Sequence, residues 1–377
     1  MIPPTLPWTD TAACLWDVLV IGAGPAGSLA ARALALRGCR VLLVDRAAFP
    51  RWKVCGACLS GRSMAILAEA GLADLPARHG AVPLHAMKLA GHQGAATVML
   101  PAGVALSRYR FDAALVEEAV GAGAAFLPQT TAALGELHAE HREVILRRPD
   151  VAQTVRARVV IAADGLGGSI APGERVVRPG SRIGAGTVAD EAPAFYEPCT
   201  IFMACTPAGY VGLVRLEDGR LDIAAALDPA AVRASGPGSA AAKLLEKTGW
   251  PGISGLAELP WRGTPALTRR TAALGCERLF VLGDAAGYVE PFTGEGIAWA
   301  MAGALALAPI AARAIAAWDP RLLTAWTARY RRVVTRRQGV CRAAASILRR
   351  PTLTSAALFL LQKAPWLARP VVHCLNG

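Results

Sequence analysis

The sequence is poor in charge and in long apolar runs. Only 18% of its 377 residues are charged, whereas 54% are hydrophobic, so an intrinsically disordered chain is excluded. No run of about eighteen or more uncharged apolar residues is present, and we therefore expect no membrane-spanning helix. Residues 1–16 lack a basic segment followed by an apolar core and do not resemble a secretory signal.

Cysteine and histidine lack the regular spacing of disulfide or metal sites. Nine cysteines, an odd number, are scattered through a chain too large to need disulfides, which favours a reducing, cytoplasmic setting. Cys55 and Cys58 form a C-x-x-C pair, which is typical of a redox dithiol or half a zinc site, but no second pair follows at zinc spacing. The five histidines between His79 and His141 show no triad or metal pattern, so we predict no metal.

Acidic residues are absent from Arg321 to the end, where eleven Lys and Arg supply nearly all of the net charge of +12. Such a segment suits contact with an acidic carrier protein or an anionic membrane surface, and it is equally consistent with a solvated helical face. It contains no nucleic-acid motif and no interleaving of aromatic and basic residues, so nucleic acid is not an expected partner.

Residues 17–46 carry a strand–turn–helix–strand pattern. An apolar strand leads into a G-x-G-x-x-G turn, a helix rich in Ala and Leu follows, and a second apolar strand ends at Asp45. This context is required of a dinucleotide-binding turn. Gly22 makes the tight turn, Gly24 lets a pyrophosphate approach the backbone, and Gly27 lets helix and strand pack closely. The helix N-terminus offers N–H groups to the phosphate, and Asp45 is placed to hold a ribose hydroxyl.

The remaining sequence predicts two sheets and a helical end. Alternating segments between residues 175 and 268 predict a mostly antiparallel sheet, and 82–101 predicts a hairpin. A helix over 111–120 has Asp112 as a cap or first-turn acid. We expect a discontinuous cofactor domain of 1–81, 102–178 and 269–318, a substrate domain of 82–101 and 179–268, and a basic helical region of 319–377.

Two later motifs, Ala163-Asp164-Gly165 and Gly283-Asp284-Ala285-Ala286-Gly287, follow the first turn in order. Together the three resemble glutathione-reductase-type FAD proteins of the para-hydroxybenzoate hydroxylase fold. The resemblance implies an α/β fold with a Rossmann FAD domain, an inserted antiparallel-sheet substrate domain and a helical C-terminal region. The stretch GDAAGYVEPFTGEGI (283–297) and the KVCG of 53–56 are similar to geranylgeranyl reductases and to FAD oxidoreductases linked to polyketide pathways.

The resemblance implies a set of cofactor-binding positions. They are Gly22, Gly24, Pro25, Ala26, Gly27, Asp45, Arg46, Arg108, Asp164, Gly165, Gly283, Asp284, Pro291, Gly294, Gly296 and Ile297. In the family, Arg108 approaches the phosphate and ribose side, Asp284 binds the ribityl chain, and the turn at Gly294 offers N–H groups to the flavin N1–C2 end. Most relatives have Glu where Asp45 stands, and the basic residue expected after Asp164-Gly165 is missing here.

Cys55 is the main catalytic candidate. In the geranylgeranyl reductase pattern this cysteine lies on the substrate face of the flavin, where its thiol can donate a proton opposite the carbon that receives hydride; the alternative is a packing role. Glu295 is a second candidate, as a proton relay or as a first-turn acid of a helix.

Other residues near these motifs have less specific signals. Those expected to line an apolar substrate pocket are Tyr210, Tyr288 and Phe292. The loop residues Arg51, Trp52 and Lys53 either bind an anionic substrate or NAD(P)H or are simply solvated.

These patterns predict a cytoplasmic or membrane-peripheral FAD-dependent oxidoreductase. Its substrate is expected to be a hydrophobic prenyl, polyketide or aromatic molecule, free or tethered to a carrier. Hydride transfer is favoured over monooxygenation through a flavin C4a-hydroperoxide, because Gly287 stands where aromatic hydroxylases usually have His. A further alternative is a non-catalytic flavoprotein that binds a membrane or carrier through 321–377. Since FAD takes the one Rossmann fingerprint, NAD(P)H or a protein donor must deliver electrons transiently.

Overall fold

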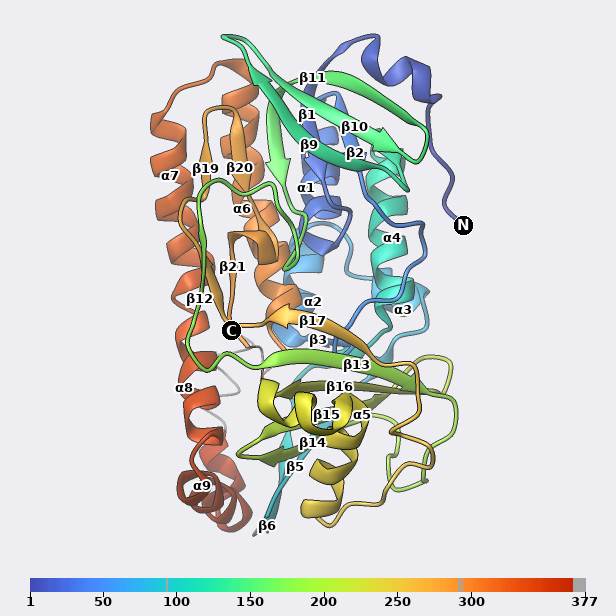
Figure 1. The fold of residues 1–377 in the computed structure, drawn as a ribbon, viewed down its shortest axis with the longest axis vertical. Coiled ribbons are helices and arrows are strands. Elements are labelled where there is room, and N and C mark those ends of the chain that lie inside the picture. Colours follow the sequence, from blue (N-terminus) through green and yellow to red (C-terminus); the bar gives the residue numbers. More distant parts are fainter. Residues whose placement is uncertain (93, 291, 293, 369–377) are drawn as a thin grey trace.

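The computed structural model describes residues 1–92, 94–290, 292 and 294–368 (Figure 1). It has two stacked regions, one built on a largely parallel sheet and the other on an antiparallel sheet, with the C-terminal helices running along both. The mixed α/β fold predicted from the sequence is confirmed.

The first sheet has the order β19-β20-β11-β1-β2-β8. Its strands are β1 (Leu15–Ile21), β2 (Val41–Val44), β8 (Ala125–Leu127), β11 (Val151–Ala162), β19 (Gly275–Cys276) and β20 (Leu279–Val281). Strand β1 pairs in parallel with β2 and β11, and β11 pairs in parallel with β20. Their apolar runs have this form because both faces are buried. Helices α1 (Pro25–Ala35), α4 (Arg108–Gly121) and α6 (Gly296–Ala316) pack together beside the sheet.

Strand β11 is longer than the sequence predicts. The pattern indicates separate strands at 155–158 and 159–163, whereas the structure has one strand of 12 residues. Its first half pairs antiparallel with β10 (Arg142–Arg148), which pairs with β9 (Thr131–Leu137), and its second half joins the parallel sheet. A single strand therefore contributes both to an antiparallel meander with β9 and β10 and to the buried parallel sheet, which the sequence predicts as two separate strands.

The second sheet has the order β17-β13-β16-β15-β14-β5-β6. Its strands are β5 (Ala86–Gly91), β6 (Gly94–Met99), β13 (Ile183–Ala189), β14 (Thr200–Thr206), β15 (Gly209–Arg215), β16 (Leu221–Leu227) and β17 (Arg262–Ala266). The predicted hairpin within 82–101 is β5–β6, and it joins the sheet through β14. Helix α5 (Pro229–Lys247) covers one face and bends at Gly236, where φ is +77°.

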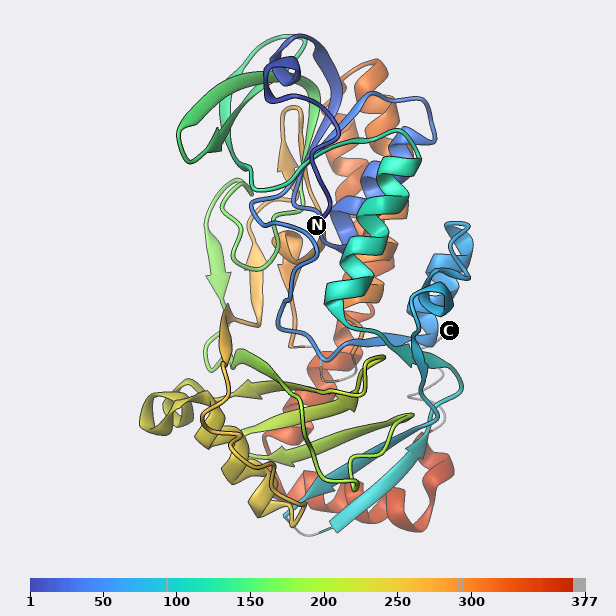
Figure 2. The same cartoon turned by 90° about the vertical axis from the view of Figure 1, so that its right-hand side faces the viewer.

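Short elements connect the two regions (Figure 2). They form two three-stranded sheets, β3-β7-β4 and β12-β18-β21. Their bounds, with those of the remaining short helices, are η1 (Trp8–Ala12), β3 (Cys58–Ser60), α2 (Gly61–Glu69), α3 (Leu75–Arg78), β4 (Val82–Pro83), β7 (Gly103–Ala105), β12 (Arg175–Val177), β18 (Arg269–Thr271), η2 (Gly283–Ala286) and β21 (Gly287–Tyr288).

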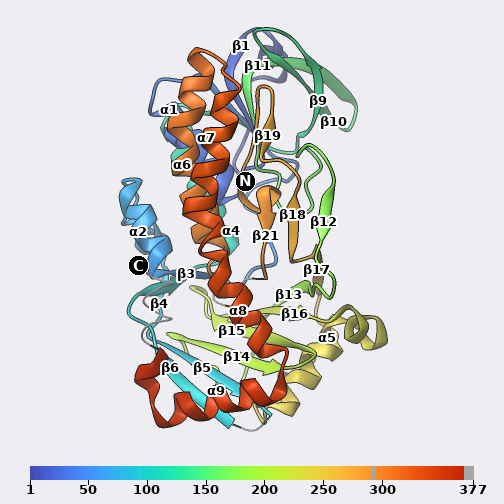
Figure 3. The ribbon, with the colours of Figure 1, turned by 90° about the vertical axis from the view of Figure 1, so that its left-hand side faces the viewer.

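The C-terminal region is helical, as predicted. It contains α7 (Arg321–Tyr330), a π-helical turn η3 (Arg331–Thr335), α8 (Gln338–Leu348), α9 (Pro351–Lys363) and η4 (Pro365–Ala368). Helix α7 packs on α6 with Trp326 and Tyr330 buried, and α9 lies across β5 and β6 (Figure 3). Helix α6 is long and apolar enough to cross a membrane, but 67% of its most apolar stretch is buried within the protein.

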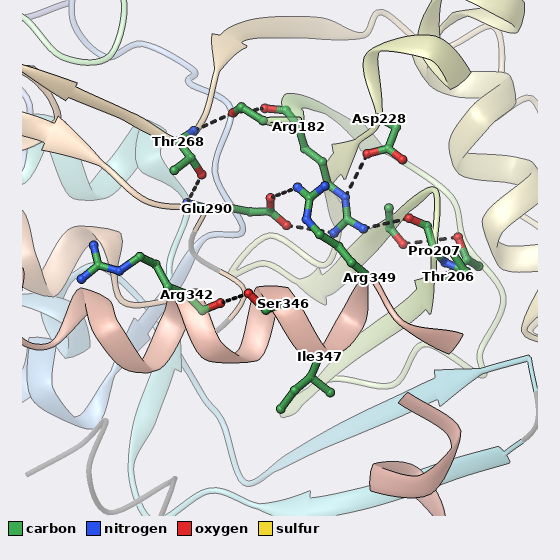
Figure 4. Close-up of polar contacts among 12 residues, drawn as sticks. Arg182, Thr206, Pro207, Asp228, Thr268, Glu290, Arg342, Ser346, Ile347 and Arg349 are labelled. Atoms are coloured by element: carbon green, nitrogen blue, oxygen red, sulfur yellow. Dashed lines mark hydrogen bonds and ion pairs between the residues drawn. The ribbon is translucent and has the colours of Figure 1, made fainter. Parts of the chain in front are cut away.

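A buried ion pair ties the second sheet to the C-terminal helices (Figure 4). Arg182, just before β13, is fully buried, and its Nη1 lies 2.9 Å from Oε1 of Glu290. The other carboxylate oxygen of Glu290 lies 3.4 Å from Nη2 of Arg349, at the end of α8. Arg182 also donates to the Pro207 carbonyl at 3.0 Å. Because the pair is withdrawn from water, loss of Arg182 leaves the buried Glu290 carboxylate with only its longer contact to Arg349.

We expect Arg182→Met to lower the free energy of unfolding by about 3–5 kcal/mol, the usual cost of breaking a buried pair. The matched control is Arg220→Met, because Arg220 pairs with Asp218 at the exposed surface and should cost no more than about 1 kcal/mol. Urea denaturation followed by intrinsic fluorescence measures both. Equal losses in the two variants would contradict this assignment.

Candidate active site

The glycine turn between β1 and α1 has no room for side chains. A Cβ added at Gly27 would lie 1.8 Å from the carbonyl oxygen of Gly22. One added at Gly22, where φ is +102°, would lie 2.3 Å from the carbonyl oxygen of Ala163. The turn thus packs directly on the end of β11, as its spacing predicts, and leaves the N-terminus of α1 facing a cavity that Pro25 and Ala26 line.

Two guanidinium groups face the open side of this turn. A Cβ at Gly24 would lie 3.6 Å from Nη2 of Arg51 and 3.9 Å from Nη2 of Arg108. Arg108 is held in a two-point pair with buried Asp112, at 2.6 and 2.7 Å, and Arg51 lies 3.2 Å from the same carboxylate. Backbone N–H groups, a helix N-terminus and two arginines together suit a pyrophosphate.

Asp112 is neither the cap nor a first-turn acid of its helix, the two roles that the sequence suggests, because α4 begins at Arg108, before the predicted start at residue 111. The cap of α4 is Ser107, whose hydroxyl accepts the Arg110 N–H at 3.2 Å. Burial would raise the pKa of Asp112, but Arg108 and Arg51 hold it below its ordinary value. The acid therefore stays charged and fixes the two arginines that face the turn.

The two predicted acids nearest the adenosine end are already bonded to backbone. Asp45 accepts the Ala23 N–H at 2.7 Å and the Ala47 N–H at 2.8 Å, so it holds the glycine turn in place. Asp164 accepts the Ser169 N–H at 2.6 Å through one oxygen, while its other oxygen is buried without a partner. Both acids and Arg46 line a cavity of about 410 Å³, in which a ribose hydroxyl would complete the hydrogen bonding.

A second cavity, of about 220 Å³, continues from the first past Gly24 and Lys53. We call it the inner cavity. The predicted residues that line it are Gly24, Pro25, Ala26, Cys55, Arg108, Gly165, Tyr210, Asp284, Tyr288, Phe292, Gly294, Gly296 and Ile297. Gly283 supports it from behind, because a Cβ there would lie 2.8 Å from the Ala26 side chain. The predicted position Pro291 lies outside the described residues.

The two adjoining cavities offer, in order, groups that suit the successive parts of an FAD molecule. The acids near Asp45 suit the adenosine ribose, the turn at Gly24 suits the pyrophosphate, and Asp284 faces the space between that turn and α6. At the far end, α6 begins at Gly296, where its N-terminal N–H groups and dipole would stabilise negative charge on a bound flavin ring.

Lys53 is the main site residue whose role the sequence left open. It lines both cavities, and its Nζ lies 3.2 Å from the Cβ position of Gly165. Burial and Arg108 lower its pKa, whereas Asp284 opposes the shift. Its place in the KVCG stretch, two residues before Cys55, is the signal for its location.

Cys55 lines the inner cavity, as do Gly294 and Gly296 of the turn that opens α6. Gly294 faces the same loop, since a Cβ there would lie 3.9 Å from Cβ of Cys58. Burial raises the pKa of Cys55, and a hydrogen bond with Arg108 opposes that shift only partly. The thiol is therefore protonated at neutral pH and able to act as a proton donor. Cys58 donates to the Gly56 carbonyl at 2.9 Å rather than pairing with Cys55.

Glu295 occupies the N-cap position of α6, but its side chain does not cap the helix. Its residue is 2% exposed, and Oε1 is buried without a partner, while the Ser60 hydroxyl bonds to the carboxyl. Burial raises its pKa to about 7. A carboxyl that titrates at neutral pH suits a proton relay, the first of the two roles that the sequence left open.

The wall of the inner cavity that β14, β15 and Phe292 form is apolar. Tyr210 of β15 meets Phe292 edge to face, with ring centroids 5.2 Å apart, and Arg182 lies 5.8 Å from the Tyr210 ring centroid. The Tyr288 hydroxyl lies 3.2 Å from the Cβ position of Gly296. The other apolar side chains here include Met87, Leu166, Ile201, Met203, Leu213 and Leu267. Phe292 and the two tyrosines come together as predicted, beside the predicted flavin turn.

A histidine cluster lies in the β9–β10 hairpin. The ligand atoms of His138, His141 and Glu143 all lie within 4.8 Å of one another, and the two imidazole rings stack at 4.4 Å. The spacing H-x-x-H-x-E across a hairpin turn is the signal that the sequence offers for it. Arg156 and Arg278 are close enough to help lower the pKa of His141.

Comparison with known proteins supports FAD as the cofactor. The family described as FAD binding domain matches residues 16–338. Digeranylgeranylglycerophospholipid reductase 2 of Methanothermobacter thermautotrophicus is 31% identical over 338 residues, covering 85% of this chain and 84% of that protein. A menaquinone reductase of Mycobacterium tuberculosis is 36% identical over 155 residues, covering 40% of this chain and 37% of that protein.

Solved structures of low sequence identity share the fold. The flavin-dependent brominase Bmp2 superposes with a TM-score of 0.78 at 16% identity, covering 96% of this chain and 94% of that one. The p-nitrophenol 4-monooxygenase PnpA of Pseudomonas putida superposes with a TM-score of 0.76 at 18% identity, covering 96% and 98%. The chain therefore belongs to the FAD-binding-domain family and is an FAD-dependent oxidoreductase, related to reductases in sequence and to monooxygenases and halogenases in fold.

Proposed function

We propose that the protein is a reductase that adds hydrogen across a carbon–carbon double bond of an apolar small molecule. The observation that carries this proposal is the position of Cys55, which lines the inner cavity together with the apolar side chains and the turn that opens α6. Burial raises the pKa of its thiol, which favours the protonated form. A reduced flavin would supply hydride at that place. The opposite carbon then needs a proton, and Cys55 is a neutral donor within the same cavity.

The chemistry of the pocket supports a prenyl-like substrate. Its walls are formed by methionine, leucine and aromatic side chains, which bind flexible hydrocarbon through dispersion and burial. The names of two relatives, a digeranylgeranylglycerophospholipid reductase and a menaquinone reductase, refer to substrates with prenyl chains. We therefore propose an unsaturated polyprenyl lipid or a related polyketide as the substrate class.

Different residues of the chain would bind the cofactor and supply the proton. Arg51, Arg108 and the glycine turn would bind the cofactor pyrophosphate, and the α6 N-terminus would stabilise negative charge on the reduced ring. Cys55 holds the proton at its Sγ. Arg108, which bonds to that thiol, is placed to stabilise the thiolate left after proton transfer.

Cys55→Ala should retain bound flavin and lose about 10²–10⁴-fold in product formation, the usual contribution of a positioned proton donor. The matched control is Cys39→Ala, because Cys39 follows α1 and lines neither the inner cavity nor the outer one. Single-turnover product formation, with the flavin spectrum as a check on folding, measures both. Turnover in Cys55→Ala equal to that of the control would remove the thiol from the mechanism.

Monooxygenation is the competing activity, favoured by the solved structures that share the fold. Gly287 argues against it, because aromatic hydroxylases usually have His at this position. The β12-β18-β21 sheet adds a second argument, since the Gly287 backbone pairs there with Arg270 at a φ of +125°, which disfavours a side chain.

In the proposed reaction, Glu295 acts as a proton relay. Its raised pKa means that the folded protein binds the carboxyl proton more tightly than the unfolded chain does. Below the ordinary pKa of 4.5, Glu295 is protonated in both states and does not change the free energy of unfolding. As pH rises from 4.5 toward about 7, its ionisation in the unfolded chain lowers the free energy of unfolding. At 1.36 kcal/mol per pKa unit the total fall is about 3 kcal/mol.

We expect Glu295→Gln to unfold at higher urea concentration than wild type at pH 8, with the difference disappearing near pH 5, because the amide cannot ionise. Glu246→Gln, on the exposed face of α5, serves as the control and should follow wild type at both pH values. An unchanged difference between pH 5 and pH 8 would show that Glu295 does not titrate in this range.

We also propose that the outer face of α9 and η4 docks on an anionic membrane, in addition to catalysis. Helix α9 buries Thr354 and Leu358 against the second sheet, whereas Phe359 and Trp366 are 59% and 62% exposed. The neighbouring charges Arg349, Arg350 and Lys363 are all basic. Exposed aromatics beside basic residues are typical of a membrane-surface helix.

The double variant Phe359→Ser/Trp366→Ser should bind vesicles that contain anionic phospholipid at least about tenfold more weakly, since each buried aromatic contributes about 1.5–3 kcal/mol. Leu137→Ser, at an exposed position of the β9 meander, is the control and should bind like wild type. Co-sedimentation at two salt concentrations measures the affinity. Equal binding of wild type and double variant would overturn this surface.

A further inference from the structure

A third cavity, of about 850 Å³, lies between the C-terminal helices and the β12-β18-β21 sheet. We call it the arginine cavity. Figure 3 shows α7 and α8 running beside this small sheet. Its volume falls in the range of pockets that hold a molecule of nucleotide size.

Five arginines line this cavity and no acid does, among the residues that the structure describes. They come from four separate segments: Arg178 after β12, Arg269 and Arg270 on β18, Arg331 at the start of η3, and Arg342 on α8. None of the five has an ion-pair partner in the described part of the chain. Such a gathering of like charges costs free energy unless an anion offsets it.

The arginines are close enough to repel one another. Arg270 and Arg178, together with burial, lower the pKa of Arg342. The Arg342 guanidinium has a long hydrogen bond of 3.4 Å to the Thr335 carbonyl, and Figure 4 shows it directed away from the Glu290 carboxylate. The buried Glu290 carboxylate thus pairs with Arg182 and Arg349 and not with Arg342, which lines the arginine cavity.

The cavity also adjoins the cofactor-binding segment. Ala286, Gly287 and Tyr288, at the end of the third FAD motif, line it, and Tyr288 lines the inner cavity as well. Uncharged hydrogen-bonding side chains complete its wall: Thr271, Thr327, Thr335 and Gln338. A molecule in the arginine cavity would therefore lie within reach of the segment that shapes the flavin site.

We propose that the arginine cavity binds the phosphate groups of a nucleotide-sized molecule that exchanges hydride with, or is reduced beside, the flavin. Planar guanidinium groups match phosphate oxygens in two-point hydrogen bonds, and several converging arginines select a pyrophosphate over a single carboxylate. This molecule is a phosphorylated nicotinamide reductant or a prenyl diphosphate substrate, and that identity rests on the proposed function. The existence of the anion site does not depend on the proposed function.

The test is thermal unfolding of the FAD-loaded protein with inorganic pyrophosphate, compared with KCl at equal ionic strength. Pyrophosphate should raise the midpoint by several degrees more than KCl does, because a ligand of the folded state stabilises it. An equal effect of the two salts would overturn the proposal. Since bound FAD fills the cofactor site, the shift reports a separate site and requires no turnover.

Arg270→Gln and Arg342→Gln should each weaken pyrophosphate binding about tenfold or more, the effect of losing a charged hydrogen bond. Without pyrophosphate both should melt at or above the wild-type temperature, because repulsion is relieved, whereas a purely structural arginine would lower it. Arg342→Lys keeps the charge and should retain most of the shift. Arg332→Gln, outside the cavity on the same helical turn, should behave like wild type. Full pyrophosphate binding in both glutamine variants would contradict the site.

Competition then distinguishes the two sources of the phosphate. Displacement of pyrophosphate by NADPH would assign the cavity to the reductant, and displacement by geranylgeranyl diphosphate would assign it to the substrate. Failure of both to displace pyrophosphate would overturn the nucleotide-sized ligand. If pyrophosphate binds as described but no double bond is reduced, the proposed function fails and the anion site stands.

Discussion

The close contact between Gly27 and Gly22 is the constraint on which the site depends. It brings the N-terminus of α1 against the end of β1, and Gly22 in turn packs on the carbonyl of Ala163 at the end of β11. Because β20, β11 and β1 are neighbours and parallel, their carboxyl ends meet at one edge of the sheet. Three motifs that are far apart in sequence therefore become one binding surface, and Gly283 completes it by packing on Ala26.

Charge is distributed to suit an anionic cofactor and an apolar substrate. Arg51 and Arg108 face the turn that suits the phosphates. The Asp112 carboxylate holds both guanidinium groups in place and lowers the net charge of the three-residue cluster. The substrate end has methionine and aromatic walls, and its titratable groups, Cys55 and Glu295, are raised in pKa by burial. Burial thus favours the protonated forms of both groups in the apolar cavity, and positive charge is placed beside the turn that suits the negative phosphates of FAD.

The sequence predicts the local and motif-based features well, and these are confirmed: the strand–turn–helix–strand pattern at the glycine turn, the β5–β6 hairpin and the helical C-terminal region. It fails where long-range contact decides the outcome. Asp112 stands early in α4, where caps and ion pairs look alike in sequence. The cap at Ser107 and the pairing of Asp112 with Arg108 and Arg51 distinguish the two roles in the structure. The pair Arg182–Glu290 and the arginine cavity join segments with no shared pattern. Roles for individual site residues remain predictions from their positions.

The central claim is that the reduced flavin and Cys55 add hydrogen to a double bond. The most direct measurement is mass spectrometry of the product formed by the chemically reduced protein, without air, from a panel of apolar unsaturated molecules in deuterated water. We predict addition of two hydrogens, one at each carbon of the double bond and both of them deuterium, because the N5–H of a reduced flavin and the Cys55 thiol both exchange with deuterated water. A product that forms only in the presence of oxygen and carries an oxygen atom from it would contradict the account.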